Sequence, residues 1–286
     1  MNRRPRGDHR VNLRSIFIIG RHELLLSVRS AWTIVFAAIF GILVTAIAYS
    51  GLMVEGFSGV QGFTRTSASL LNLVLYIIPL VALIMGVMTF TGEDPTLELL
   101  FSQPVLRSEI VLGKLLGLFS SFALSTIIGF GVAGFFIASQ AGTSGILGYL
   151  AFVFLSLLLG FVFLCLSALV SVLARRRTQA IGLAIFLWFF FVIFYDLLVI
   201  AATVVLRGPT ANTILFLSLL GNAVDMVRVA SLIALGNVTI FGAAGAALLR
   251  FFGGGSTSVL FLFAGLGLWI LIPLFLTVRA IQRQDI

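Results

Sequence analysis

Long apolar runs without a charged residue alternate with short charged segments along the chain. One run extends over Ala31–Val54, a second over Thr66–Gly92, and a third, of 60 residues, over Leu115–Ala174. A bilayer core about 30 Å thick is crossed by about 20 helical residues, because a helix satisfies its backbone hydrogen bonds inside lipid. The first two runs each predict one membrane-spanning helix, and the third is long enough for two.

Small and polar residues divide the third run. Residues 139–145 read Ser-Gln-Ala-Gly-Thr-Ser-Gly, which is typical of a turn. A fifth span is predicted over Ala180–Leu206, interrupted only by Asp196, and a sixth over Val259–Val278, after the flexible stretch Gly253–Ser256. The pattern therefore predicts an all-α integral membrane protein with six transmembrane helices.

The basic residues favour one orientation. With the N-terminus in the cytoplasm, 14 of the 18 Lys and Arg residues precede span one, follow span six or lie in the loops after spans two and four. Basic flanks are retained on the cytoplasmic side of a membrane. We therefore expect both termini in the cytoplasm, with four basic residues outside: Arg65, Arg207, Arg228 and Arg250.

The outer loop, residues 207–258, contains the uncharged run Val229–Leu249, which could form a seventh span. That span would move Arg279 and Arg283 to the outside, and its glycine-containing stretches are only mildly apolar. We favour a re-entrant or interfacial element in the outer leaflet.

Composition agrees with a membrane protein and excludes a soluble one. Of 286 residues, 60% are apolar and 10% charged, against about 45 to 50% and about 25% in soluble domains. The net charge of +8 comes from residues in short gaps, so no nucleic-acid partner is predicted. The single cysteine, Cys165, excludes a disulfide framework. We expect a multi-pass protein of the inner membrane whose N-terminal segment is retained.

Motifs for ATP hydrolysis and for metal binding are absent. Gly113-Lys114 is followed by Leu115 and lacks the spacing of a phosphate-binding loop. His9 and His22 have no cysteine or carboxylate at ligand spacing, so neither a metal site nor a cofactor is predicted. The chain is expected to be non-catalytic, with any ATP-driven work performed by a separate subunit.

Two other pairs of residues lie on single helix faces. Met85 and Met88 share a face of span two, and we favour core packing over contact with a soft metal. Gly113 and Gly117 have the spacing that allows a close helix approach.

The loop between spans two and three, residues 92–114, contains a predicted short helix. Asp94-Pro95 is a helix-start signal, three apolar residues share one face of the next turn, and Gln103-Pro104 ends it. A second start follows at Ser108-Glu109. The loop is either a solvated connector or a helix on which a soluble partner docks.

The run Thr96–Lys114, TLELLFSQPVLRSEIVLGK, resembles the first cytoplasmic loop of type-2 ABC transporter permeases. The resemblance implies a coupling helix that fits a groove on the ATP-binding subunit. It implies ATPase-coupling roles for seven residues: Leu97, Glu98, Leu100, Phe101, Pro104, Arg107 and Glu109. A second cytoplasmic loop with Arg175, Arg176 and Arg177 is expected on the same side.

The segment Arg21–Ser30 resembles the connecting helix of that family, so residues 1–30 are expected to form a cytoplasmic N-terminus with an interfacial helix. Arg14, Arg21 and Arg29 cluster on one side of it, although two apolar residues share that sector. They either anchor the helix to anionic lipid or contact the partner.

The outer segment Leu219–Val229 resembles the corresponding loop of NosY-type permeases, from the copper-processing system that matures nitrous oxide reductase. Those permeases have Asn-Pro where this chain has Asn222-Ala223. The resemblance implies a periplasmic partner on the loop around Asn222, Asp225 and Arg228, and a role in copper or sulfur supply.

Asp196 is the one ionisable residue within a predicted span. A charge there costs at least a few kcal/mol on insertion scales, so it should have a partner, and Asn72 or Tyr76 of span two are the candidates. A functional latch or substrate contact and a purely structural aspartate both stay open.

These features predict that residues 31–286 form one six-helix permease domain that works as two copies with an ATPase subunit. Export of a drug, lipid or saccharide is an alternative within the same class. A standalone secondary carrier or membrane scaffold is an alternative from another class. A carrier normally shows several polar groups at the membrane midplane, and Asp196 stands alone.

Overall fold

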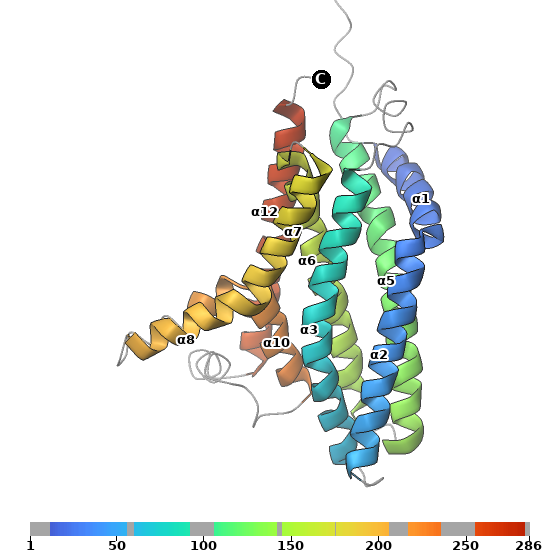
Figure 1. Cartoon of the computed structure of the whole chain (residues 1–286), viewed down its shortest axis with the longest axis vertical. Coiled ribbons are helices and arrows are strands. Elements are labelled where there is room, and N and C mark those ends of the chain that lie inside the picture. The colour runs from blue at the N-terminus through green and yellow to red at the C-terminus, as the bar shows by residue number, and fades with distance from the viewer. Residues whose placement is uncertain are drawn as a thin grey trace, which may run out of the picture.

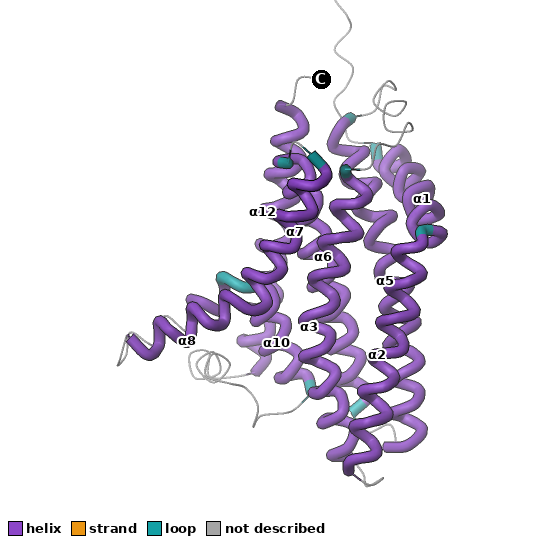
Figure 2. Tube along the Cα trace, in the orientation of Figure 1, coloured by secondary structure: helices purple, strands orange, loops and turns teal. Residues whose placement is uncertain are grey.

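The computed structural model describes residues 12–55, 60–91, 106–141, 145–174, 176–205, 217–235 and 255–283, and within these ranges it contains helices and no strand. Within these ranges few residues lie outside helices, and they form short loops and turns such as the one between α1 and α2 (Figure 2). The helices are α1 (Leu13–Arg29), α2 (Ala31–Glu55), α3 (Val60–Phe90), α5 (Arg107–Ala141), α6 (Ile146–Leu173), α7 (Arg177–Phe189), the π-helical η1 (Phe190–Phe194), α8 (Tyr195–Val205), α10 (Ala223–Ala234) and α12 (Gly255–Arg283).

Among the described residues, six helical segments are long and apolar enough to cross a membrane, in agreement with the six predicted spans. Their positions follow the uncharged runs, and the third run is divided at the predicted turn, since α5 ends at Ala141 and α6 begins at Ile146. The candidate spans are Ala31–Ser50, Ser69–Phe90, Arg107–Ser139, Ile146–Leu173, Arg177–Ala202 and Thr257–Arg283.

The core lies between α3, α5 and α6. About two thirds of the residues in the most apolar stretch of α6 are buried, whereas only 11% are buried in the most apolar stretch of the α7–α8 span. Aromatic side chains fill the centre, where the ring of Phe130 packs edge-on against Phe40 and Phe152. Figure 1 shows the long helices side by side, with α8 leading away from the bundle.

Glycines allow α1 to lie directly on α5. A Cβ atom at Gly113 would come within 2.7 Å of the Ile19 side chain, and a Cβ atom at Gly117 would overlap the Gly20 carbonyl. The close helix approach predicted from Gly113 and Gly117 is therefore present, and its partner is the N-terminal helix.

Two helix starts can be compared with the prediction. The α5 helix begins at Arg107, within one residue of the predicted start, with Glu109 in its first turn. The α12 helix begins at Gly255, so the last two residues of the stretch expected to be flexible are helical. The backbone N–H groups of the first helical turn have no intrahelical acceptor, so glycine and serine are tolerated there.

A π-helical segment interrupts the fifth span, which the apolar pattern did not predict. Residues Phe190–Phe194 form η1, and α8 continues from it in a direction that takes it away from the other helices (Figure 1). A π turn inserts one residue into the helical ladder, and such turns are common at functional sites.

The outer segment is helical where it is described. The α10 helix packs on α6 and α12. It begins at Ala223, so Val229–Ala234 continue a helix that starts before the uncharged run. Residues 236–249, which would decide between a re-entrant element and a seventh span, lie outside the described residues.

Candidate functional site

Two clusters of charged residues lie far apart in the molecule. The first, here named the α5 cluster, contains Glu23, Arg107, Glu109 and Lys114 around the start of α5. The second, the α8–α10 cluster, contains Asp196, Asp225 and Arg228. The α1 helix, the start of α5 and the end of α12 lie at one end of the bundle, and α10 lies toward the other (Figure 1).

Glu109 attaches the start of α5 to the start of α1. Its Oε1 accepts a hydrogen bond of 2.6 Å from the backbone N–H of Asn12, and the residue is buried. Asn12 is the N-cap of α1, where its side chain accepts from the Arg14 N–H at 3.0 Å. The carboxylate therefore stabilises a helix end on a neighbouring element as well as its own first turn.

Lys114 joins three helices. Its Nζ lies 3.8 Å from Glu23 Oε2 of α1 and donates to the Thr89 carbonyl of α3 at 3.4 Å, and the side chain is buried. The C-terminal carbonyls of a helix carry partial negative charge, so an ammonium group beside the end of α3 is favourable. Glu23 also accepts from Ser27 Oγ at 3.4 Å.

Arg107 connects the same point to the last helix. Its Nη1 donates to the Ile281 carbonyl of α12 at 2.9 Å. The α5 cluster thus links α1, α3, α5 and α12 at both ends of the predicted coupling loop. Five predicted coupling residues lie outside the described residues: Leu97, Glu98, Leu100, Phe101 and Pro104.

The second predicted loop is described in part. Arg176 is the N-cap residue of α7, and Arg177 is its first residue. The Arg177 Nη2 lies 2.7 Å from the Met88 sulfur near the end of α3. Arg175 lies outside the described residues.

In the α8–α10 cluster, one guanidinium group is shared by two carboxylates. Arg228 Nη1 donates to Asp196 Oδ2 at 3.0 Å and to Asp225 Oδ1 at 2.6 Å. The side chains of Asp196, Arg228 and Asp225 are 34%, 26% and 14% exposed, so the cluster opens on the Asp196 side.

Asn222 connects this cluster to the π-helical segment. Its Oδ1 accepts from the Val224 N–H at 3.0 Å, as expected of an N-cap, and its Nδ2 donates to Asp225 Oδ2 at 3.0 Å. Nδ2 also donates to the Phe191 carbonyl of η1 at 2.8 Å. A π turn breaks the regular ladder of helical hydrogen bonds and leaves carbonyl groups without their usual donors. The side chain of Asn222 supplies a donor to one carbonyl of η1, that of Phe191.

The turn before α10 is held to the span helices by further hydrogen bonds. Tyr195 Oη donates to the Ser218 carbonyl at 2.7 Å, and Trp269 Nε1 donates to the Leu220 carbonyl at 3.0 Å. A Cβ atom at Gly221 would overlap the Tyr195 hydroxyl. These contacts fix Asn222, which is fully buried, against α8 and α12.

The electrostatics of the cluster follow from its charges, two carboxylates that share one guanidinium group. The pKa of Asp225 is raised to about 7, because burial and the nearby Asp196 carboxylate together outweigh the opposing effect of Arg228. Burial lowers the pKa of Arg228, but the Asp225 and Asp196 carboxylates outweigh that effect and raise it. The arginine therefore remains charged, and Asp225 is the group in α10 poised to exchange a proton near neutral pH.

The partner of Asp196 differs from the predicted one. Arg228 binds the carboxylate, and neither Asn72 nor Tyr76 forms a hydrogen bond to it among the described residues. Instead, the Tyr76 carbonyl accepts from Trp188 Nε1 at 2.9 Å. The i, i+3 spacing of Asp225 and Arg228 indicates only that these two residues share one helix face, and it does not report the contact of Arg228 with Asp196.

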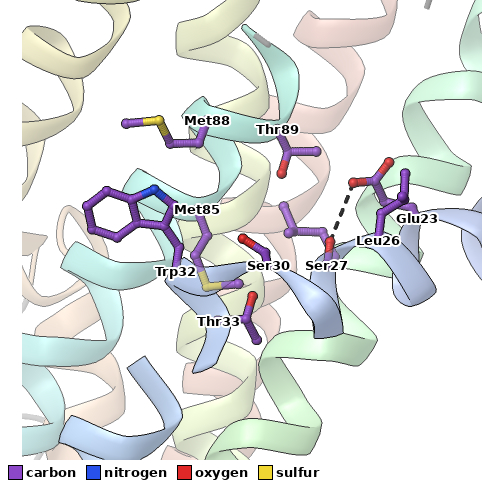
Figure 3. Close-up of a pocket in the computed structure, with 10 residues that line it drawn as sticks. Glu23, Leu26, Ser27, Ser30, Trp32, Thr33, Met85, Met88 and Thr89 are labelled. Carbon is purple, nitrogen blue, oxygen red and sulfur yellow. Dashed lines mark hydrogen bonds between the residues drawn. The ribbon is translucent and has the colours of Figure 1, made fainter. Parts of the chain in front are cut away.

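A cavity of about 200 Å³ lies beside the α5 cluster, where α1 turns into α2. Figure 3 shows Met85 and Met88 together on its α3 side, and Glu23 bonded to Ser27 on its α1 side. The two methionines therefore share a face as predicted. No group of three His, Cys, Asp or Glu residues suited to a metal occurs in the described part of the chain.

Comparison with known proteins gives a family and two relatives. A family model described as ABC-2 family transporter protein matches residues 17–286. The chain is 35% identical over 223 residues to the "Probable ABC transporter permease protein NosY" of Pseudomonas aeruginosa, which covers 76% of this chain and 81% of the relative. The protein of the same name from Stutzerimonas stutzeri is 34% identical over 226 residues, or 77% and 82% of the two chains.

Proposed function

The chain belongs to the ABC-2 transporter family, and on that premise we propose how this permease subunit is driven. A separate ATPase subunit binds the cytoplasmic loop 92–105, and its ATP-dependent movement displaces the start of α5. The α5 helix and its neighbours carry the displacement through the inner membrane to the α8–α10 cluster. The chain itself performs no chemistry.

The α5 cluster is the observation that carries this proposal. The loop 92–105 leaves α3 and enters α5, and the first turns of α5 are bonded to three other helices through Glu109, Lys114 and Arg107. These contacts are buried or half-buried, where hydrogen bonds to charged groups are worth about 1.5 to 3 kcal/mol each. A displacement of the loop is therefore shared by α1, α3 and α12.

At the opposite end we propose that the α8–α10 cluster is a polar latch. The bonds of Arg228 to Asp196 and of Asn222 to Phe191 hold α10 against the bend between α7 and α8. A change in that bend alters the outer surface on which a periplasmic partner docks. Because Asn222 is fully buried, we assign it a bracing role behind that surface.

The similarity to permeases named NosY supports a role in copper or sulfur supply to nitrous oxide reductase over export of a drug, lipid or saccharide. A strain that lacks the gene should lose nitrous oxide reduction and regain it with the wild-type chain. Unchanged nitrous oxide reduction in that strain would contradict the role without affecting the coupling proposal.

The coupling proposal is tested by co-purification with the ATPase subunit. We expect the wild-type chain to retain the ATPase and the double variant Leu97→Asp/Phe101→Asp to lose it, because charges replace the apolar face of the predicted helix. The control is Leu99→Asp/Ser102→Asp, on the opposite face of that helix, which should retain the ATPase. Equal retention by both double variants would contradict the proposal.

A further inference from the structure

Another cavity, of about 430 Å³, lies between α6, α10 and α12. Leu166 and Leu169 of α6 form one wall, and Leu268, Ile272 and Leu276 of α12 form another. The three α12 side chains are 44% to 57% exposed, so the cavity opens to the outside of the bundle beside them. Both α6 and α12 are candidate membrane spans, and the opening is therefore bordered by lipid.

The interior of this cavity is apolar. Among the described residues that line it, the polar side-chain group is the indole N–H of Trp269, which donates to the Leu220 carbonyl at 3.0 Å. Met226 of α10 is fully buried and closes the cavity near Gly265, where a Cβ atom would lie 2.7 Å from the Met226 methyl group. An apolar cavity does not hold water, and empty space costs its walls their dispersion contacts. The membrane supplies hydrocarbon to fill it.

The dimensions of the cavity match one acyl chain. Along α12 it extends from Gly265 to Leu276, which is about 16 Å, and one leaflet contributes about 15 Å of the hydrocarbon core. Spread over that length, its volume gives a mean cross-section of about 26 Å². Carbon atoms pack about 3.5 to 4.0 Å apart, so one chain fits. A helix is about 10 Å across with its side chains, so the cavity is too narrow for a helix of a second copy.

Two arginines continue the cavity face of α12 toward its C-terminal end. Arg279 follows Leu276 by three residues and Arg283 follows it by seven, which places both on the face that carries Leu276. Both are exposed, and they lie beyond the end of the cavity, at the end of the molecule that carries α1 (Figure 1). The span Thr257–Arg283 has 27 residues, or about 40 Å. A bilayer with its headgroup layers is about 40 to 45 Å thick, so these arginines reach a headgroup layer.

We propose that the cavity and the two arginines bind one anionic phospholipid from the leaflet at the α1 end, with one acyl chain in the cavity and the phosphate at Arg279 and Arg283. Guanidinium groups donate paired hydrogen bonds to phosphate oxygens. Phosphatidylglycerol keeps its negative charge, whereas phosphatidylcholine brings an ammonium group toward two further cations. No residue of the α5 cluster or the α8–α10 cluster takes part, so the site is independent of the proposed function.

The position of the acyl chain is tested by fluorescence quenching of the purified chain in detergent, without its ATPase. Trp32→Phe/Trp188→Phe leaves Trp269 as the one tryptophan of the chain, and bromine atoms in the middle of an acyl chain quench an indole that they touch. We expect brominated phosphatidylglycerol to quench Trp269 at about a tenth of the amount needed with brominated phosphatidylcholine, because basic residues attract anionic headgroups. Native mass spectrometry of the unmodified chain is the second measurement, and it should show phosphatidylglycerol retained in preference to phosphatidylcholine.

Filling the cavity tests the hydrocarbon half of the site. Ile272→Phe/Leu276→Phe, made in the single-tryptophan background, places two rings in the cavity and should abolish the quenching by phosphatidylglycerol. The matched control is Leu260→Phe/Leu271→Phe. These leucines are exposed on the opposite face of α12, and their replacement should leave the quenching unchanged.

Replacing the arginines tests the headgroup half of the site. Arg279→Gln/Arg283→Gln should need about ten times more phosphatidylglycerol for the same quenching. Arg279→Lys/Arg283→Lys keeps both charges, and its response should stay close to that of the wild-type residues, since lysine also binds phosphate.

Several results would overturn the proposal. They are equal quenching by the two brominated lipids, undiminished quenching in Ile272→Phe/Leu276→Phe, and an unchanged lipid requirement in Arg279→Gln/Arg283→Gln. Quenching that disappears when the chain dimerises would show that a second copy covers the cavity. Displacement of the brominated lipid by an equal concentration of soluble glycerol phosphate would show a ligand taken from solution. Both of these results contradict a bound membrane lipid.

Discussion

At the residue scale, the three charges of the α8–α10 cluster are unequal in their importance. Arg228 bonds to both Asp196 and Asp225. Taking an ionised side chain out of water is costly, and a partner offsets that cost only while both charges are present. Loss of the arginine leaves two carboxylates facing each other, whereas loss of one aspartate leaves a complete ion pair.

Arg228→Gln is therefore expected to lower the free energy of unfolding more than Asp196→Asn. The cluster is partly exposed, so we expect about 2 to 3 kcal/mol for the arginine, below the effect in a fully buried pair. For Asp196→Asn we expect about 1 kcal/mol. Denaturant unfolding in detergent micelles measures both, and a larger effect of Asp196→Asn would contradict the shared-guanidinium arrangement.

The latch role predicts a separate effect of Asp196→Leu. This variant removes the α8 side of the contact, and it should lower ATP hydrolysis by the complex while the amount of co-purified ATPase stays unchanged. Wild-type ATP hydrolysis in Asp196→Leu would leave the aspartate with a structural role only.

The raised pKa of Asp225 predicts a pH dependence of stability. Its pKa is about 7 in the folded chain and about 3.9 for an unperturbed aspartate, so between these values the folded state binds more protons than the unfolded state. Its contribution to stability is then fully present below about pH 4 and falls as pH rises toward 7. Asp225→Asn should be more stable relative to wild type at pH 8 than at pH 5, as measured by unfolding at both values. Parallel pH profiles would contradict the shift.

At the element scale, contact between α1 and α5 depends on the absence of side chains. Gly20, Gly113 and Gly117 let the two backbones approach, and the buried bonds of Glu109 and Lys114 form only at that separation. In membranes, close packing of this kind is a main source of helix association, because lipid offers helices no hydrophobic drive to associate.

Gly117→Ala is expected to push α1 away from α5 and to lower the free energy of unfolding by about 1 to 3 kcal/mol, as overpacked cores do. A Cβ atom there would lie 2.6 Å from Glu23 Cβ and 2.9 Å from the Leu24 nitrogen. Gly131→Ala is the matched control in the same helix, since a Cβ atom there meets nothing within 4 Å. Equal stability of the two variants would show that α1 is not clamped.

The elements were predictable where charge or turn residues mark their ends. Spans two to four follow from the charge-free runs, and the start of α5 follows from Ser108-Glu109. The π-helical segment could not be predicted, because Phe-Phe-Val-Ile-Phe has the composition of its neighbours. The Asp196–Arg228 bond joins residues 32 positions apart, and no local spacing reports a contact between separate helices.

At the scale of the whole molecule, the two charged clusters lie toward opposite ends of a bundle whose centre is α6 and α3. In the most apolar stretches of α6 and α3, 67% and 61% of the residues are buried, whereas the corresponding share for the α7–α8 span is 11%. A span that carries an aspartate and has so little cover within its own chain is expected to be covered by a second copy.

The purified chain should therefore have a protein mass of twice 30.8 kDa in detergent, as measured by native mass spectrometry. In a Cys165→Ala background, single cysteines replacing Leu197, Ile200 or Val204 of α8 should give cross-linked dimers. A cysteine replacing Leu147, which is exposed at the start of α6, should not. A monomeric mass, or cross-linking only at position 147, would contradict this arrangement.

The hydrogen bond from Arg107 to the Ile281 carbonyl spans 174 positions of the sequence, and it has a consequence for biogenesis. During synthesis, the acceptor for Arg107 becomes available only after the last helix has left the ribosome and entered the bilayer. Nascent chains that stop before that point lack one of the contacts at the start of α5. Under the coupling proposed above, an incomplete subunit is therefore expected to be a poorer partner for the ATPase subunit than the finished chain.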